Sequence, residues 1–177
     1  MPSGMVSSFE NACVLPGSFN PLHDAHRAMM QFATRSTGRA GFFELSVTNV
    51  DKPSLTKTQL RERLAESFAP AALLLTRLPT FEAKSDAFAG AVFVVGGDTI
   101  RRIDDLKYYS HQESEFRRAI ARIKANGIRF LVFGRNVNRQ FLDEKSLSLQ
   151  PELLDLCDFV TRSDFEMDVS STGLRNQ

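Results

Sequence analysis

The chain has 177 residues, of which 42% are hydrophobic and 24% are charged, as in ordinary soluble globular proteins. Its formal net charge of +1 gives no reason to expect nucleic acid or an anionic membrane surface as a partner. No apolar run approaches the roughly 18 residues of a membrane span, so no membrane segment is expected. We therefore expect residues 1–177 to form one domain with a sizeable core.

The two cysteines, Cys13 and Cys157, lie far apart in apolar runs and form no CxxC pair. This usage is typical of buried thiols in a reducing compartment. Residues 1–10 lack the basic segment and apolar core of a signal peptide. The sequence thus predicts a cytoplasmic protein.

Short apolar runs alternate with segments of helical period along the whole chain. Strands are predicted at 11–15, 42–48, 73–78, 91–95, 129–133 and 159–161. Helices are predicted at 24–35, 56–69 and 113–126. The first has an apolar stripe of Ala25, Ala28, Met29, Phe32 and Ala33. The second opens with the capping-box spacing of Thr56 and Gln59 and has Leu60, Leu64 and Phe68 on one face. This alternation predicts an α/β fold: a Rossmann-like, three-layer αβα domain with a mainly parallel sheet.

Three turns rich in glycine and polar residues follow predicted strands. They are residues 17–26, Gly96-Gly97-Asp98-Thr99 and Gly134-Arg135-Asn136. In a parallel sheet the carboxyl ends of the strands meet at one edge, where ligands bind. We therefore expect one edge of the domain to allow close backbone approach to a ligand.

The first of these turns carries the strongest signal, Gly17-Ser18-Phe19-Asn20-Pro21-Leu22-His23-Asp24-Ala25-His26. It joins a strand to the start of a helix, where glycine and free N–H groups favour phosphate. His23 and His26 lie three residues apart and off the apolar stripe, so their imidazoles could meet phosphate oxygens. Two solvated histidines near a helix cap are the alternative, and zinc ligation is a weaker one because a third ligand is lacking nearby.

A second segment, Val169-Ser170-Ser171-Thr172-Gly173-Leu174-Arg175, lies near the end of the printed sequence. If a helical turn begins there, its hydroxyl and N–H groups would face a phosphate, and the planar fork of Arg175 could reach the same oxygens. Taken alone, the segment also fits an ordinary serine-threonine turn.

Together the two segments resemble the HxGH and SSTxxR motifs of the nucleotidylyltransferase superfamily. The resemblance implies transfer of a nucleotidyl group from a nucleoside triphosphate to a phosphorylated acceptor. It implies catalytic roles for His23, His26 and Arg175. Nucleotide contacts are implied for Gly17, Ser18, Phe19, Asp98, Arg135, Ser170, Ser171 and Thr172. Ala25 stands where the family has glycine.

The middle of the chain resembles a branch with nicotinamide mononucleotide adenylyltransferase-like and cytidylyltransferase-like members. The similar residues are Phe43-Glu44-Leu45-Ser46, Asp51-Lys52-Pro53, Gly97-Asp98-Thr99 with Arg102, and Lys107-Tyr108-Tyr109. By this resemblance Asn49 and Lys52 would bind the acceptor. The chain has no tryptophan, so Tyr108, Tyr109 or a phenylalanine would stack on an acceptor ring. From the residues alone, Asp98 could equally be a helix N-cap, and Asn49, Lys52 and Arg135 could be exposed turn residues.

We therefore expect an adenylyltransferase that uses ATP and a phosphorylated small molecule, with nicotinamide or nicotinate mononucleotide as the first candidate acceptor. Mg²⁺ would be carried mainly by the triphosphate, and no protein metal site is expected. Within the enzyme class the alternatives are a cytidylyltransferase and a phosphopantetheine-type adenylyltransferase. A nucleotide-binding module without turnover is the alternative of another class, suggested by Ala25. Assembly into a homo-oligomer is left open.

Overall fold

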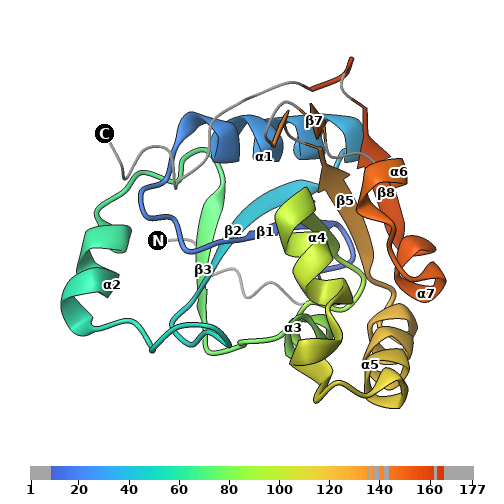
Figure 1. Ribbon diagram of the computed structural model, residues 1–177. Helices are drawn as coiled ribbons and strands as arrows, with labels where there is room; N and C mark the ends of the chain where they lie inside the picture. Colours follow the sequence, from blue (N-terminus) through green and yellow to red (C-terminus); the bar gives the residue numbers. More distant parts are fainter. Residues whose placement is uncertain (1–8, 135, 138–139, 142–143, 162, 166–177) are drawn as a thin grey trace.

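The computed structural model describes residues 9–134, 136–137, 140–141, 144–161 and 163–165 (Figure 1). Six parallel strands form one sheet in the order β3-β2-β1-β4-β5-β8. They are β1 (Ala12–Pro16), β2 (Ala40–Ser46), β3 (Ala72–Thr76), β4 (Val92–Gly96), β5 (Arg129–Phe133) and β8 (Cys157–Val160). All six correspond to predicted strands, which confirms the predicted α/β class with its parallel sheet.

Helices connect the strands, together with one small hairpin. The helices are α1 (Asp24–Thr37), α2 (Lys57–Leu64), α3 (Phe81–Ala87), α4 (Gly97–Asp104), the 3-10 helix η1 (Leu106–Tyr109), α5 (Glu113–Ala125), α6 (Glu144–Leu147) and α7 (Pro151–Leu154). Two short strands, β6 (Asn136–Val137) and β7 (Gln140–Phe141), pair antiparallel. Helix α5 ends as predicted, because Gly127 follows it in the left-handed region at φ 68°.

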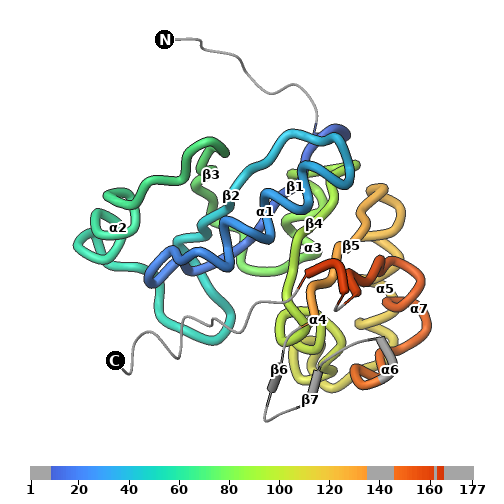
Figure 2. Tube along the Cα trace, turned by 90° about the horizontal axis from the view of Figure 1, so that it is seen from above, coloured from blue at the N-terminus to red at the C-terminus, as the bar shows by residue number. Residues whose placement is uncertain are grey.

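The sheet has a hydrophobic core on each face, because successive side chains of a strand point to opposite faces and both are buried here. Leu15, Phe43 and Val94 face α1, whereas Val14 and Phe93 belong to the other core. That second core takes its helical members from α4, α5, α6 and α7: Ile100, Ile103, Phe116, Ile120, Ile123, Leu147 and Leu153. The domain therefore has three layers, and Figures 1 and 2 show α1 along one face of the sheet.

Helix α1 packs very closely on β2. Its buried residues are Ala25, Met30 and Ala33, and Met29 and Phe32 are partly buried against the same core. A Cβ atom at Gly41 would lie 2.6 Å from Met30 Sδ and 2.8 Å from Thr34 Cγ2. The absence of a side chain at Gly41 thus sets the distance between this helix and the sheet, and Met30 becomes a core residue that the predicted stripe omitted.

The prediction for 56–69 was right about the start of the helix and wrong about its extent. Thr56 Oγ1 accepts the N–H of Gln59 at 3.2 Å, and Gln59 Oε1 accepts the N–H of Thr56 at 3.0 Å, so the predicted capping box is present. The helix ends at Leu64, whose side chain is 47% exposed, and Phe68 is buried beyond the helix end. Of the predicted apolar face, only Leu60 is a residue of α2 that packs against the core, and the helix itself lies at the left margin of Figure 1.

The two cysteines differ in environment. Cys13 is fully buried on β1, and burial raises the pKa of its thiol. Cys157 on β8 is only half-buried, so the prediction of two buried thiols holds for Cys13 alone.

One ion pair is buried at the carboxyl end of the sheet. Lys84 Nζ on α3 donates to both carboxylate oxygens of Glu44 on β2, at 2.8 and 2.7 Å, and the Thr76 hydroxyl donates to the same carboxylate. Glu44 is 1% exposed and Lys84 is 5% exposed. Burial lowers the pKa of Lys84, and Glu44 opposes that effect. Each charge therefore depends on the other to remain in the core.

We predict that Lys84→Met destabilises the domain by about 3–5 kcal/mol, because it leaves the Glu44 carboxylate buried without its cation. The double variant Glu44→Met/Lys84→Met should recover much of that loss. Lys107→Met, which removes one partner of an exposed pair with Asp105, serves as the control and should change stability by less than about 1 kcal/mol. Urea denaturation measures all three, and equal losses in the single and double variants would show that the pair is not coupled.

Candidate functional site

The strand order locates the place where the sheet can receive a ligand. From β1 the chain moves outward to β2 and β3, and then returns to place β4 on the other side of β1. Such a reversal opens a crevice beyond the carboxyl ends of the two central strands. The turn that starts at Gly17 follows β1, and Gly96 ends β4, with Gly97 and Asp98 directly after it. The structure therefore brings the first two predicted glycine turns to the same edge, with Gly134 at the end of the adjacent β5.

The turn after β1 is shaped by Gly17 and Phe19. The Gly17 N–H donates to the Glu44 carbonyl at 2.9 Å, and Phe19 lies in the left-handed region at φ 41°. The Phe19 ring is 1% exposed, with edge contacts to Phe43, Phe68 and His26. A Cβ atom on Gly17 would lie 2.6 Å from Phe19 Cε1, so glycine is needed there. Since the Phe19 side chain faces the core, only its backbone can make the predicted nucleotide contact.

The two histidines lie together at the start of α1. His23 is the N-cap in an extended conformation, and the His23 and His26 rings stack with centroids 3.7 Å apart. The His23 N–H donates to His26 Nδ1 at 3.3 Å. An Nδ1 that accepts a hydrogen bond leaves the ring hydrogen of neutral His26 on Nε2. His26 can therefore donate a hydrogen bond through Nε2.

Both imidazoles are neutral near pH 7. Burial lowers the pKa of His26 to about 4, with smaller contributions from the nearby His23 and Arg27. Burial also lowers the pKa of His23, against the opposing charge of Asp24. Stacked rings this close cannot both take a proton without repulsion. The pair is thus a set of neutral donors at a helix N-terminus, whose own dipole favours an anion.

Ala25 lies between the histidines in sequence and points into the protein. Its side chain is 5% exposed, and it is one of the buried residues of α1. The Ala25 methyl group is therefore covered by the chain itself.

The edge beside β4 is open. A Cβ atom at Gly96 would meet no atom within 4 Å. Gly96 is also the N-cap of α4, which makes Asp98 an exposed residue of the first helical turn. The alternative in which Asp98 caps the helix is therefore wrong, because the helix begins two residues earlier than that alternative requires.

The loop after β2 contains the predicted acceptor residues. Asn49 Oδ1 accepts the Asp51 N–H at 2.8 Å, and both Asn49 and Lys52 are exposed. Asp51 forms an ion pair with Arg102 of α4 and accepts the Tyr108 hydroxyl at 2.8 and 2.9 Å. This bridge ties the loop after β2 to the segment after β4, and no local sequence pattern predicts it.

The two candidate stacking tyrosines have different environments. The Tyr109 hydroxyl donates to the Ile103 carbonyl at 2.9 Å and its ring contacts Phe116, while burial raises its pKa to about 12. Tyr108 stays near the surface, with Lys107 Nζ 4.7 Å from its ring centroid. Hydrogen bonding with Arg102 lowers the Tyr108 pKa. Of the two, only Tyr108 is placed to meet a ligand.

Sequence reasoning missed Arg63. It is 8% exposed, although α2 is otherwise a surface helix, and its Nε donates to the Ser18 carbonyl at 3.1 Å. A local pattern could not reveal it, because Arg61 and Arg63 look alike in sequence and only the fold of the segment distinguishes them. The remaining predicted residues, Arg135, Ser170, Ser171, Thr172 and Arg175, lie outside the described residues.

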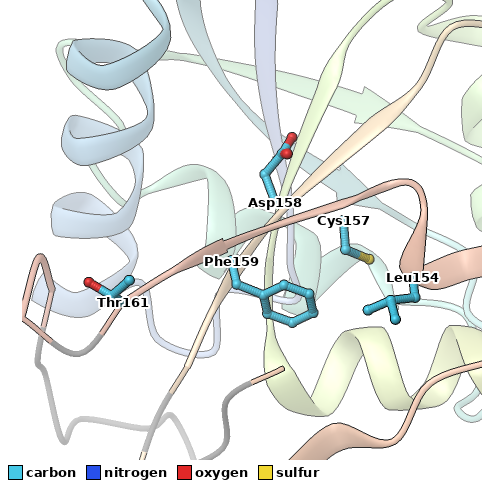
Figure 3. Close-up of a pocket in the computed structure, with 5 residues that line it drawn as sticks. All are labelled: Leu154, Cys157, Asp158, Phe159 and Thr161. Atoms are coloured by element: carbon cyan, nitrogen blue, oxygen red, sulfur yellow. The ribbon is translucent and has the colours of Figure 1, made fainter. Parts of the chain in front are cut away.

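Figure 3 shows a surface hollow at the outer strand β8, far from the histidines in strand order. Cys157 and Phe159 project to one side of the strand, where Leu154 at the end of α7 also lies, and Asp158 projects to the other side. Asp158 accepts hydrogen bonds from Arg129 at 2.6 and 3.1 Å. The hollow does not combine residues that could carry out catalysis.

The described part of the chain lacks two further features. Within it, no three side chains of histidine, cysteine, aspartate or glutamate come together as a metal site would require. No helix within those residues has the length and apolar character needed to cross a bilayer.

Comparison with known proteins gives a structural match but no sequence match. No family model and no curated protein matches the chain. Among solved structures, the chain is similar to Plasmodium falciparum nicotinic acid mononucleotide adenylyltransferase complexed with NaAD, with a TM-score of 0.56. The match has 15% sequence identity and covers 94% of this chain and 82% of the other. At this identity the similarity establishes the shared Rossmann-like fold.

The depressed pKa of His26 predicts acid sensitivity. Its pKa is about 4 in the folded protein, against 6.5 when unperturbed, so protons bind preferentially to the unfolded chain between these values. The stabilising contribution is complete above pH 6.5 and is lost as the pH falls to about 4. After allowance for solvent screening, we expect His26→Asn to remove about 1–2 kcal/mol of the stability change across this window.

Denaturation curves at several pH values measure this effect. His111→Asn is the matched control, since His111 is exposed and its φ of 58° suits asparagine. An acid response of His26→Asn that equals the wild-type response would contradict the assignment of a half-buried, neutral imidazole.

Proposed function

We propose that this protein is a nucleotidyltransferase that transfers the adenylyl group of ATP to the phosphate of a mononucleotide, nicotinamide or nicotinate mononucleotide being the first candidate. The observation that carries the proposal is the pair of stacked neutral histidines at the start of α1, on a glycine turn at the switch point of the sheet. The fold shared with an adenylyltransferase that was solved with a dinucleotide supports it.

In the proposed reaction, an oxygen of the acceptor phosphate attacks the α-phosphorus of ATP. A bond forms between them as the bond from that phosphorus to the bridging β-phosphate oxygen breaks, and pyrophosphate leaves. A phosphate acceptor is already ionised near neutral pH, so the reaction needs no strong general base. Alignment and charge stabilisation then supply the rate enhancement.

Each residue at the edge has a role in this scheme. His26 donates its Nε2 hydrogen to an oxygen of the transferring phosphoryl group, and His23 supports it from the N-cap. The first turn of α1 adds its dipole. Asn49 and Lys52 bind the acceptor on the loop after β2. By resemblance, Ser170, Ser171, Thr172 and Arg175 hold the departing pyrophosphate, and Arg135 and Asp98 contact the nucleotide.

Mg²⁺ fits this site as an ion carried by the triphosphate. Mg²⁺ keeps most of its waters and needs few protein ligands, and the exposed carboxylate of Asp98 suits contact with such a water. When bound, the ion would neutralise charge on the phosphate oxygens. No step assigned to the histidines depends on it.

The experiment that tests the function is a pyrophosphate-release screen of ATP and CTP against phosphorylated acceptors, including nicotinamide and nicotinate mononucleotides and phosphopantetheine. Release with ATP and a pyridine mononucleotide is the expected result. Release with CTP or with phosphopantetheine would reassign the substrate and keep the reaction. Triphosphate binding without release across the panel would indicate a binding module.

His26→Ala should lower turnover by at least about a hundredfold, because loss of one donor to developing phosphoryl charge typically costs about 3 kcal/mol. Steady-state kinetics at saturating substrate measure this, with His111→Ala as the control. Wild-type turnover in His26→Ala would remove His26 from the mechanism.

Arg175→Ala and Lys52→Ala should separate the two substrates. The arginine fork is assigned to the β and γ oxygens, so its loss should raise the apparent KM for ATP much more than that for the acceptor. Lys52→Ala should have the reverse effect. If both variants weaken ATP alone, the acceptor does not lie beside the loop after β2.

Ala25→Gly tests whether the alanine limits activity. Because the Ala25 methyl is buried by the chain, its removal should cost about 1 kcal/mol of helix stability and give no gain in turnover. Calorimetric ATP titration with a pyrophosphate assay on both forms measures the effect. A sharp rise in turnover in the glycine variant would mean that the methyl blocks productive binding.

A further inference from the structure

Arg63 connects a peripheral helix to the turn that carries the proposed phosphate site. The residues around it on α2 are exposed, yet Arg63 itself is 8% exposed. Its Nε donates to the Ser18 carbonyl at 3.1 Å, across a separation of 45 residues in sequence. A buried guanidinium that ends on a backbone carbonyl of this turn requires a reason beyond the stability of α2.

Residues 63–68, which begin with Arg63, contact both the turn after β1 and the start of α1. Arg27 Nη1, one residue after His26, donates to the Ser67 carbonyl at 2.6 Å. Phe68 then packs its ring against Phe19, with centroids 5.4 Å apart. This segment therefore contacts Phe19 in two ways. Phe68 packs against its ring, and Arg63 binds the carbonyl of the preceding residue, Ser18. Figures 1 and 2 both show α2 beside the connection from β1 to α1.

The Arg63 hydrogen bond determines the direction of one N–H group. The peptide between Ser18 and Phe19 is trans, since the cis peptides of the described chain are Asn20-Pro21 and Ala69-Pro70. In a trans peptide the N–H points opposite to the C=O. The Ser18 carbonyl points to α2, so the Phe19 N–H points away from it. This N–H is the group through which Phe19 could meet a phosphate, because its ring is in the core.

The same contact improves the electrostatics of the turn. A carbonyl oxygen directed at a phosphate would repel it, and Arg63 holds this oxygen on the opposite side. Its positive charge also sits against the outer side of the turn, where the surrounding chain limits screening by solvent, although the exposed Glu62 carboxylate 3.7 Å from Arg63 Nη1 offsets part of it. We propose that Arg63 is a positioning residue that orients the Ser18-Phe19 peptide so that its N–H serves the triphosphate, and this inference rests on the proposed function.

Arg63→Gln tests the assignment, with Arg61→Gln as a matched control that removes the same charge from an exposed position of the same helix. Calorimetric titration with ATP and with inorganic tripolyphosphate measures binding, and amide spectra report the turn at residues 17–23. We expect Arg63→Gln to bind both probes at least about tenfold more weakly, with shifted turn amides, an unchanged KM for the acceptor and nearly wild-type melting. Arg61→Gln should resemble the wild type, and Arg63→Lys should recover part of the loss.

The possible outcomes separate the two proposals. If the wild type binds ATP and Arg63→Gln binds it equally well, the inference about Arg63 is wrong and the proposed function stands. If the wild type binds neither probe, nor CTP, the proposed function fails and the inference fails with it. Should Arg63→Gln not fold, Arg63→Lys decides: binding about threefold weaker than wild type supports the positioning role, and unchanged binding overturns it.

Discussion

The Phe19 ring beneath Gly17 is the contact on which the candidate site depends. It requires glycine at one end of the turn, places Phe19 in the left-handed region and gives His26 an aromatic edge to pack on. The Gly17 N–H is meanwhile fixed to the carbonyl of Glu44, whose side chain forms the buried pair with Lys84. The turn is thus part of the core, which allows its backbone and histidines to be held in one geometry.

Neutral histidines suit the proposed chemistry better than a permanent cation would. A neutral donor leaves the free site without a buried charge to solvate, and an arriving phosphate supplies the charge that strengthens the hydrogen bond. Two arginines lie outside the ring pair, each near a carboxylate: Arg63 behind the turn, 3.7 Å from Glu62, and Arg102 in the bridge to Asp51. The site therefore combines a rigid set of neutral donors with ion-paired arginines at its margin.

The sequence predicted what local patterns determine. The six parallel strands, the start of α1 and the capping box of α2 follow from apolar runs, the glycine turn and the Thr56–Gln59 spacing. The end of α2 could not be predicted, because Leu60, Leu64 and Phe68 have helical spacing but the chain leaves the helix after Leu64 to bury Phe68. Arg63 and the contact of Asp51 with Tyr108 were missed because each joins residues far apart in sequence. Arg135 and residues 170–175 are predicted from sequence alone.

The central claim is that a triphosphate binds at His26, and titration of its imidazole by NMR tests this most directly. In the free protein the His26 pKa should be about 4. Saturation with ATP should raise it by about one unit or more, because a phosphate anion beside Nε2 favours the protonated ring. The His111 signal provides an internal reference on the surface. Binding of ATP that leaves the titration of His26 unchanged would place the triphosphate elsewhere and contradict this account.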